Sequence, residues 1–361
     1  EPIIAPELNP DCLLETVKYF TQSTGNLLSL NFLGIFRDYT SEFICYTGLS
    51  VKLKKESFGL CLSQSKGYDM RYYTKKTCFY NSSNTEFAHY IAGLIEGDGS
   101  IHTPKAERSR KGVINYPNIQ IVFHLKDLPL ALLIQKELGC GSISRKKGVN
   151  AYIYTINNYE GLILLINIIN GNMKTNKIYA LHRLIDWYNK YKGTSLEKKA
   201  LNTESIISNA WLSGFIDSDG HFSLRSTESG KHPKIECKFE LCQRQIDHNN
   251  LDNLFFLEEI ALSINSVVKS IRNDSNNPQY RIRTTSLKAN LAVVNYLVKY
   301  PLFGSKFLDY KDWVKVVKLF EQGSLDHKLN MEYVKHIKSN MNDKRTVFVW
   351  DHLQNFYNLN K

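Results

Sequence analysis

One sequence pattern occurs twice in this chain, and it constrains the fold more than any other feature. The segment from His89 to Ile101 reads HYIAGLIEGDGSI, and the segment from Ala210 to Phe222 reads AWLSGFIDSDGHF. In both, an apolar helical run leads through a small residue and Gly to an acid, then to Asp-Gly and a strand-like segment. One copy could be an ordinary helix-to-strand turn, since Gly tolerates the backbone angles of turns. Two copies at domain spacing indicate two equivalent halves.

The acids of the repeat are the first candidates for chemistry. Glu96 and Asp98 in the first copy, and Asp217 and Asp219 in the second, lie at the C-terminal ends of their predicted helices. The helix dipole disfavours negative charge at that end, so acids placed there usually face a cation. We therefore expect these carboxylates to have a cationic partner.

A stripe of small residues accompanies the acids on each predicted helix. Gly93 and Gly97 are four residues apart, and Gly214 and Ser218 repeat that spacing. Small residues at this spacing let two helix backbones approach closely. If the two helices pack together through these positions, the terminal aspartates of both copies meet.

The two motifs also carry a family resemblance. GLIEGDG at 93–99 and GFIDSDG at 214–220 resemble the signature motifs of a single-chain LAGLIDADG homing endonuclease, a type usually encoded inside organellar introns. The resemblance covers residues from about Thr85 to about Phe320. It implies two pseudo-symmetric half-domains, with antiparallel sheets that form a DNA-binding saddle and helices on the other face.

The predicted elements follow the same division and indicate an α+β fold, with strands and helices in segregated layers. Alternation is clearest in Asn118–Lys126 and in Lys234–Leu241, where every second residue is apolar. The expected parts are an N-terminal extension of unassigned fold at 1–84, a first half-domain at 85–191, a linker at 192–205, a second half-domain at 206–330 and a C-terminal segment at 331–361.

The net charge points to a polyanionic partner. The 361 residues carry +11, of which residues 1–84 contribute only +1, so the excess lies in the region that contains the motifs. A merely solvated surface is the alternative explanation. We expect double-stranded DNA as the partner, and the resemblance adds the chain's own intron RNA as a further one.

Several other classes are disfavoured. Seven cysteines form no C-x-x-C pair, so we expect reduced thiols rather than a zinc site or a disulfide framework. No apolar run reaches the length of a membrane span, and no secretory signal is evident. The chain begins with Glu1 rather than Met, which suggests a processed product or a fragment. The basic, tyrosine-rich stretch 52–76 has two explanations, nucleic-acid binding or a solvated leader.

By resemblance, Asp98 and Asp219 are the catalytic acids that hold two or more divalent ions, with Mg²⁺ as the cofactor. The backbone carbonyls of Gly97 and Ser218 are expected to assist. Mg²⁺ takes oxygen ligands and is held by only one or two carboxylates plus substrate phosphates, so one Asp per half is sufficient. Glu96 and Asp217 are then expected to support the helix ends or contact water.

The resemblance also implies a peripheral lysine in each half. The best matches are Lys177 and Lys306, which would polarise the water network or offset charge on the phosphate. A lysine that simply occupies the first turn of a helix is the alternative for each. A polar residue is expected at the end of the long strand, and aligning the two strands places Gln243 opposite Asp127. This mismatch predicts that the two half-sites differ in activity.

The outward strand faces and the adjoining loops are expected to contact DNA. A two-stranded ribbon fits the major groove, and a pseudo-twofold protein matches the symmetry of the duplex. A charged outward face is also what a solvated sheet presents, so each contact is a separate hypothesis. The candidate residues are Asn118, Gln120, His124, Lys126, Arg145, Lys147, Lys234, Glu236, Lys238, Glu240, Arg272, Arg281 and Arg283.

Together these features predict a monomeric, metal-dependent DNA endonuclease that cuts both strands of a long, nearly asymmetric target across the minor groove. The alternative is an intron RNA maturase that assists splicing of its own intron, with or without DNA cleavage. A DNA-binding regulator derived from the fold is a third class. The resemblance to organellar intron products predicts the mitochondrial matrix as the location. The lack of an apolar run of membrane-span length predicts no membrane partner.

Overall fold

The computed structural model describes residues 85–227, 234–323 and 327–357, and these belong to one compact unit, Thr74–Lys361. The stretch 52–76 and four of the seven cysteines lie outside the described residues. Within them, Cys140, Cys237 and Cys242 form no disulfide bond with one another. None of the helices in these ranges is long and apolar enough to cross a bilayer.

The elements form two successive sets with the same order. We call α3 to α6 the first half and α7 to α10 the second half. The first half comprises α3 (Thr85–Asp98), β1 (Gly99–His102), β2 (Asn118–His124), a 3₁₀ turn (Leu125–Asp127), α4 (Leu128–Leu138), β3 (Ser142–Arg145), β4 (Ala151–Ile156), α5 (Tyr159–Ile169) and α6 (Ile178–Lys192). The second comprises α7 (Trp211–Asp219), β5 (Gly220–Thr227), β6 (Lys234–Arg244), α8 (Leu254–Ser263), β7 (Val268–Ile271), β8 (Gln279–Arg283), α9 (Leu287–Lys299) and α10 (Lys306–Glu321).

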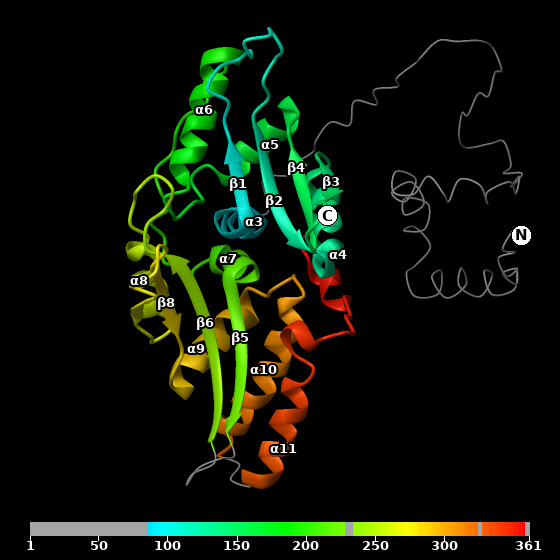
Figure 1. Cartoon of the computed structure of the whole chain (residues 1–361), viewed down its shortest axis with the longest axis vertical. Coiled ribbons are helices and arrows are strands. Elements are labelled where there is room, and N and C mark those ends of the chain that lie inside the picture. The colour runs from blue at the N-terminus through cyan, green and yellow to red at the C-terminus, as the bar shows by residue number, and fades with distance from the viewer. Residues whose placement is uncertain (1–84, 228–233, 324–326, 358–361) are drawn as a thin grey trace, which may run out of the picture. The chain divides into compact units, whose positions relative to one another are not determined.

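Each half contains one four-stranded antiparallel sheet (Figure 1). The strand orders are β1-β2-β4-β3 and β5-β6-β8-β7, so the two sheets share one topology. Gly99 pairs with Ile121 in the first sheet, and Gly220 pairs with Leu241 in the second. Because Gly99 and Gly220 follow the aligned motifs, this register makes Ile121 and Leu241 equivalent positions.

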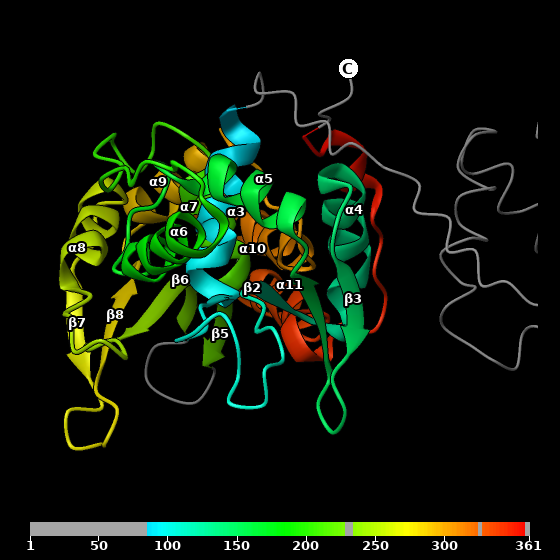
Figure 2. The same ribbon diagram turned by 90° about the horizontal axis from the view of Figure 1, so that it is seen from above.

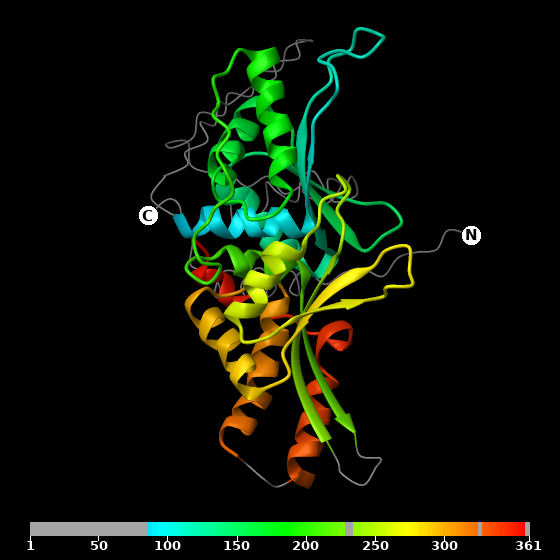
Figure 3. The same ribbon diagram turned by 90° about the vertical axis from the view of Figure 1, so that its left-hand side faces the viewer.

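The sheets and the helices occupy different layers. Figures 2 and 3 show strands β2, β5 and β6 toward one side, with α5, α6 and α9 on the other. The expected alternation holds: Ile119, Ile121 and Phe123 are buried against the helices, while Val122 and His124 are exposed. The strand β2 ends at His124, whose ring Nδ1 accepts a hydrogen bond from the Lys126 backbone N–H at 3.3 Å. The expectation that the strand continues to Lys126 is therefore wrong.

Helices α3 and α7 cross at the junction of the halves, and their backbones touch. A Cβ added to Gly93 would lie 2.0 Å from the carbonyl oxygen of Trp211. In the same way, a Cβ on Gly214 would lie 2.0 Å from the carbonyl oxygen of Tyr90. No side chain fits at either position without moving one helix away from the other. The small-residue stripe is thus the contact surface between the halves.

A C-terminal segment covers this junction. It contains α11 (His327–Lys338) and two 3₁₀ turns (Asn342–Lys344 and Asp351–Asn355). Its last described residues, Phe356 and Tyr357, make ring contacts with Phe87 and Tyr90 of α3, at centroid distances of 5.7–6.1 Å. The expected boundary between 330 and 331 falls inside α11. The segment therefore joins the second half to the first.

We predict that Gly214→Ala destabilises the protein by at least about 2 kcal/mol, since overpacking that displaces backbone costs this much or more. Equilibrium denaturation with a chemical denaturant measures the change. The control is Gly193→Ala at the end of α6, where φ is 65° and no atom lies within 4 Å of the added Cβ. That variant bears only backbone strain, about 1 kcal/mol. Equal losses for the two variants would contradict close packing of α3 on α7.

Candidate catalytic site

The C-terminal ends of α3 and α7 lie side by side. A Cβ built on Gly97 would lie 1.7 Å from Ser218 Oγ and 2.9 Å from Asp219 Oδ2. The carboxylates that follow, Asp98 and Asp219, are close enough for the charge of Asp219 to raise the pKa of Asp98. The structure thus brings the two aspartates of the repeat together.

The surroundings disfavour ionisation of both aspartates. The pKa of Asp98 is raised from 3.8 to about 6, first by loss of solvation and then by repulsion from Asp219. Asp98 as a whole residue is nevertheless exposed, so its carboxylate keeps part of its contact with water. Burial also raises the pKa of Asp219, against the opposing effects of Lys306 and of a hydrogen bond from Gln243. Because the two carboxylates repel each other, a cation bound between them would stabilise their ionised forms.

Two half-buried lysines lie beneath the aspartates and close the helix ends. The Lys177 Nζ donates to the carbonyl oxygens of Ile95, Glu96, Gly97 and Gly99 at 2.7–3.2 Å. The Lys306 Nζ donates to the carbonyl oxygens of Ile216 and Ser218 at 3.0 and 2.7 Å. Burial lowers the pKa of both lysines, while the nearby acids oppose that shift. These ammonium groups explain how acids are tolerated at the negative ends of helices.

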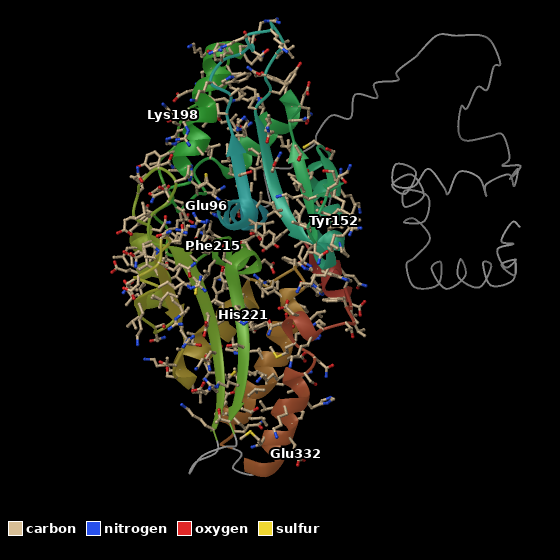
Figure 4. All side chains as sticks on the ribbon, in the orientation of Figure 1. Glu96, Tyr152, Lys198, Phe215, His221 and Glu332 are labelled. Carbon is tan, nitrogen blue, oxygen red and sulfur yellow. The ribbon has the colours of Figure 1, made fainter. Side chains whose placement is uncertain are left out.

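The other two acids of the motifs hold the halves together. Glu96 accepts hydrogen bonds from the backbone N–H groups of Lys174 and Thr175 and from the indole of Trp211 on α7. Figure 4 shows Glu96 near the middle of the described unit, between the two halves. Burial raises its pKa, and these hydrogen bonds lower it. Both carboxylate oxygens of Glu96 accept hydrogen bonds, so this residue has a structural role.

Asp217 repeats this arrangement in the second half. It accepts from the backbone N–H groups of Phe303 and Gly304 at 2.8 and 3.1 Å, and from the hydroxyl of Tyr90 on α3 at 2.8 Å. Burial raises its pKa to about 6 against these hydrogen bonds. Tyr90 and Trp211 occupy the same position in the two motifs. Sequence reasoning missed this pair, although aligning the copies places a ring with a hydrogen-bond donor at that position in both.

The polar residue at the end of the long strand occurs in the second half alone. Gln243 donates from Nε2 to Asp219 Oδ2 at 2.8 Å. The register that equates Leu241 with Ile121 equates Gln243 with Phe123, two residues further along each strand. The alignment of Gln243 with Asp127 is therefore wrong. It failed because it matched Phe239 to Phe123, whereas the strand pairing matches Phe239 to Ile119.

Asp127 nevertheless reaches the site from a different element. It precedes α4, and its Oδ1 accepts a hydrogen bond from the backbone N–H of Ser305 at 2.6 Å. Its charge contributes to the raised pKa of Asp98. A cavity of about 290 Å³ here is lined by residues that include Asp98, Asp127 and Lys306. The two aspartates thus have different neighbours, an acid beside Asp98 and an amide beside Asp219.

The candidate DNA-binding residues divide into three groups. Asn118, Gln120 and His124 lie on the outward face of β2, and Lys234, Glu236, Lys238 and Glu240 lie on that of β6. Arg281 and Arg283 lie on the outward face of β8. Lys126, Lys147 and Arg272 lie outside the strands, and Arg145 ends β3 with the parity of the buried Ile143. Both acids among these candidates form ion pairs: Glu236 pairs with Lys234 and Lys238 at 2.8 and 2.7 Å, and Glu240 pairs with Arg283.

The donors at the junction fit a hard divalent cation. In the described ranges, no three His, Cys, Asp or Glu side chains gather as they would in an all-protein metal cage. The junction offers two carboxylates and the carbonyl oxygens of Gly97 and Ser218. Each carbonyl accepts one lysine hydrogen bond and keeps a second lone pair. Such oxygen donors suit Mg²⁺, which completes its shell with phosphate and water.

A protein-family model described as LAGLIDADG endonuclease matches residues 91–188 and 212–317, once for each half. The chain belongs to this family. Among its relatives is the intron-encoded DNA endonuclease aI3 of Saccharomyces cerevisiae, which is 32% identical over 306 residues. The aligned region covers 75% of this chain and 73% of the yeast protein. The intron-encoded RNA maturase bI4 of the same yeast is 34% identical over 141 residues, which are 39% of this chain and 20% of the maturase.

Solved structures of LAGLIDADG meganucleases share the fold. I-SmaMI bound to uncleaveable DNA is 19% identical, with a TM-score of 0.54 over 72% of this chain and 99% of that chain. I-AabMI bound to uncleaved DNA is 20% identical, with a TM-score of 0.56, and the match covers 71% of this chain and 99% of I-AabMI. At these identities the likeness concerns architecture alone. It confirms the expected α+β fold with two half-domains.

We predict that Asp98→Asn stabilises the metal-free protein by about 1 kcal/mol at pH 8, a value reduced for the solvent access of Asp98. Its pKa is higher in the folded state than in the unfolded one, so ionisation costs stability. The cost is absent below about pH 4, grows up to pH 6 and is complete above it.

Denaturant unfolding in a chelating buffer measures this difference at pH 5 and pH 8. The control is Asp186→Asn, because Asp186 is an exposed acid on α6 that pairs with Lys198 at 2.9 Å. That variant should gain nothing at either pH. A less stable Asp98→Asn protein at pH 8 would show that favourable contacts, rather than repulsion, dominate at Asp98.

Proposed function

We propose that this chain is a site-specific double-strand DNA endonuclease that hydrolyses one phosphodiester bond in each strand of a long, nearly asymmetric target. The single observation that carries the proposal is the meeting of Asp98 and Asp219 at the junction of two equivalent halves. The two strands of a duplex are related by local twofold symmetry. A protein with one carboxylate per half at its own pseudo-twofold axis can therefore address one phosphate in each strand.

The reaction requires divalent metal ions, which we take to be Mg²⁺. Asp98 and Asp219 would hold them, with the carbonyl oxygens of Gly97 and Ser218. When bound, the ions neutralise the scissile phosphate, lower the pKa of the attacking water and stabilise the leaving oxygen. The residues of the chain then have defined tasks. Gln243 orients Asp219 through its amide, which leaves its carbonyl oxygen free to accept from a water.

Lys177 and Lys306 act from beneath the carboxylates. Each ammonium group is fixed by backbone carbonyls and cannot swing out toward solvent without leaving them unsatisfied. Their positive charge keeps both aspartates more ionised at neutral pH than burial alone would allow. In this proposal they act as fixed electrostatic supports, and the phosphate benefits from the same positive field.

The remaining parts follow from this assignment. Residues 85–191 and 206–330 form the two half-domains, and the protein acts as a monomer because one chain supplies both carboxylates. The sheet faces and loops described above bind the duplex. An organellar location, the mitochondrial matrix, agrees with relatives such as the cox1 intron-2 protein of Schizosaccharomyces pombe, which is 26% identical over 245 residues.

A second function, intron RNA maturation, is favoured by the similarity of 141 residues to the yeast maturase bI4. A maturase needs the fold and a basic surface but not the carboxylate pair. The two functions therefore differ in their dependence on Asp98 and Asp219.

We predict Mg²⁺-dependent cleavage of a plasmid that carries the joined exon sequence flanking the chain's own intron. Asp98→Asn and Asp219→Asn should each reduce linear product by at least about a hundredfold, since each removes charge from the metal site. Gel electrophoresis of the plasmid measures this loss. Lys198→Gln, on the helix side, is the control and should cut normally. Intact plasmid with the unmodified chain, together with faster splicing of the intron transcript, would replace the nuclease with the maturase.

We also predict that Gln243→Ala slows the cut of one strand about tenfold and leaves nicked circles, because it removes a positioned polar group that the first half lacks. Strand-specific end labels identify the slowed strand. The control is Phe123→Leu at the equivalent position, which keeps the apolar character and should leave both cuts unchanged. Equal slowing of the two strands by Gln243→Ala would contradict the assignment of Gln243 to one half-site.

A further inference from the structure

The register makes the outward faces of the two sheets comparable position by position. Ile121 pairs with Tyr154 in the first sheet, and Leu241 pairs with Ile282 in the second. Tyr154 pairs with Ile143, and Ile282 pairs with Val268. These inward positions are therefore equivalent across β2, β4 and β3 in the first sheet and β6, β8 and β7 in the second. The neighbouring residue on each strand points outward, and these residues form a second set of equivalent positions.

One such row, which we call the central rung, lies next to those buried pairs. In the first sheet it consists of Val122, Ile153 and Ser144. In the second sheet it consists of Cys242, Arg281 and Lys269. The same place on two equivalent surfaces is thus aliphatic in one half and basic in the other.

The difference extends over the whole faces. The outward residues of the first sheet include no Lys, Arg, Asp or Glu: they are Ser100, His102, Asn118, Gln120, Val122, His124, Ser142, Ser144, Ala151, Ile153 and Thr155. The charged outward residues of the second sheet are Arg225, Lys234, Glu236, Lys238, Glu240, Arg244, Lys269, Arg281 and Arg283. Seven of these nine are basic, so this face has a net charge of +5.

Internal ion pairs show which basic groups are available. Glu236 engages Lys234 and Lys238, and Glu240 engages Arg283. Within the described ranges, Arg281 and Lys269 form no ion pair. Arg281 lies on the inner strand β8 and Lys269 on the edge strand β7, and neither has an acidic partner in an ion pair among the residues that the structure describes. Arg281 is therefore the best placed side chain of that face to bind an external acceptor.

The exposure of the aliphatic rung is equally informative. Val122 is 39% exposed on a strand whose other outward residues are Asn, Gln and His. Val122 lies opposite the half-buried Ile153, so two aliphatic side chains are adjacent on an otherwise polar outward face. In a major groove, the apolar group that can contact them is the C5-methyl of thymine.

We propose that the two sheets read chemically different half-sites. The first half reads an A·T-rich half-site, in which Gln120 pairs with adenine and the Val122–Ile153 patch contacts thymine methyl groups. The second half reads a half-site that contains guanine, through Arg281. The inference rests on the proposed function, since it assumes that both sheets enter major grooves. The chemistry is that of the groove edges: guanine offers two acceptors to an arginine, and adenine an acceptor and a donor to an amide.

The same difference between the two strand faces predicts that they contribute unequally to the salt dependence of DNA affinity. Neutralising phosphates with Lys and Arg releases counterions, so affinity falls as salt rises. The outward strand face of the first sheet carries no Lys or Arg, so the strand face of the second sheet supplies more of this salt-sensitive affinity than that of the first. Contacts from Val122 and Gln120 carry no charge, and their loss leaves the salt slope unchanged.

The experiment is selection of bound duplexes from a randomised pool by the full chain in a chelating buffer, where cleavage does not remove binders. Sequencing should yield a site with one A·T-rich half and one half containing a fixed guanine. Arg281→Gln should weaken the guanine preference at one position about tenfold. Val122→Ser should weaken a thymine preference in the opposite half by a similar factor, a smaller effect than loss of folding would produce.

Lys198→Gln serves as the control for a general loss of positive charge, because Lys198 pairs with Asp186 on the helix side. It should leave the selected sequence unchanged. Two halves of the same base composition, or effects of Arg281→Gln and Val122→Ser in the same half, would overturn this inference while specific binding persists. A pool that shows no sequence enrichment at all would instead overturn the proposed function, so the two failures are distinguishable.

Discussion

The structure depends on one contact, the approach of α3 and α7 at backbone distance. Gly93 and Gly214 each lie where a Cβ would overlap a carbonyl of the other helix. That contact brings the ends of both helices together and therefore fixes where Asp98 and Asp219 are. If the helices were separated by ordinary side chains, about 8–10 Å axis to axis, the carboxylates would no longer share one site.

Placing two carboxylates side by side at the ends of two helices is electrostatically unfavourable, and nearby lysines reduce that cost. Burial and mutual repulsion raise the pKa of Asp98, and the dipoles of both helices act in the same direction. Lys177 and Lys306 oppose these effects while they satisfy carbonyls that the helix ends leave open. The two lysines therefore offset the repulsion between the carboxylates only in part, and the pKa of both aspartates stays raised.

Much of the fold and of the site could be predicted from the sequence, because the spacing of residues in the duplicated motif indicates how the two helices pack. The small-residue stripe predicted the helix contact, and period-two alternation predicted the buried faces of β2 and β6. The alignment of Gln243 with Asp127 failed, because two strands of similar composition can be aligned four residues out of register and keep their parity. The side-by-side placement of Asp127 and Ser305 could not be predicted, since they are 178 residues apart and belong to different halves.

The exchange of ring donors across the junction has an evolutionary consequence. Tyr90 serves Asp217 in the other half, and Trp211 serves Glu96, so each half completes a buried acid that it does not contain. A gene fusion that joined either half to a partner without this aromatic residue would remove one hydrogen bond from Glu96 or Asp217 and leave only those from its own half. A fused half therefore keeps this hydrogen bond across the junction only when its partner brings the matching aromatic residue.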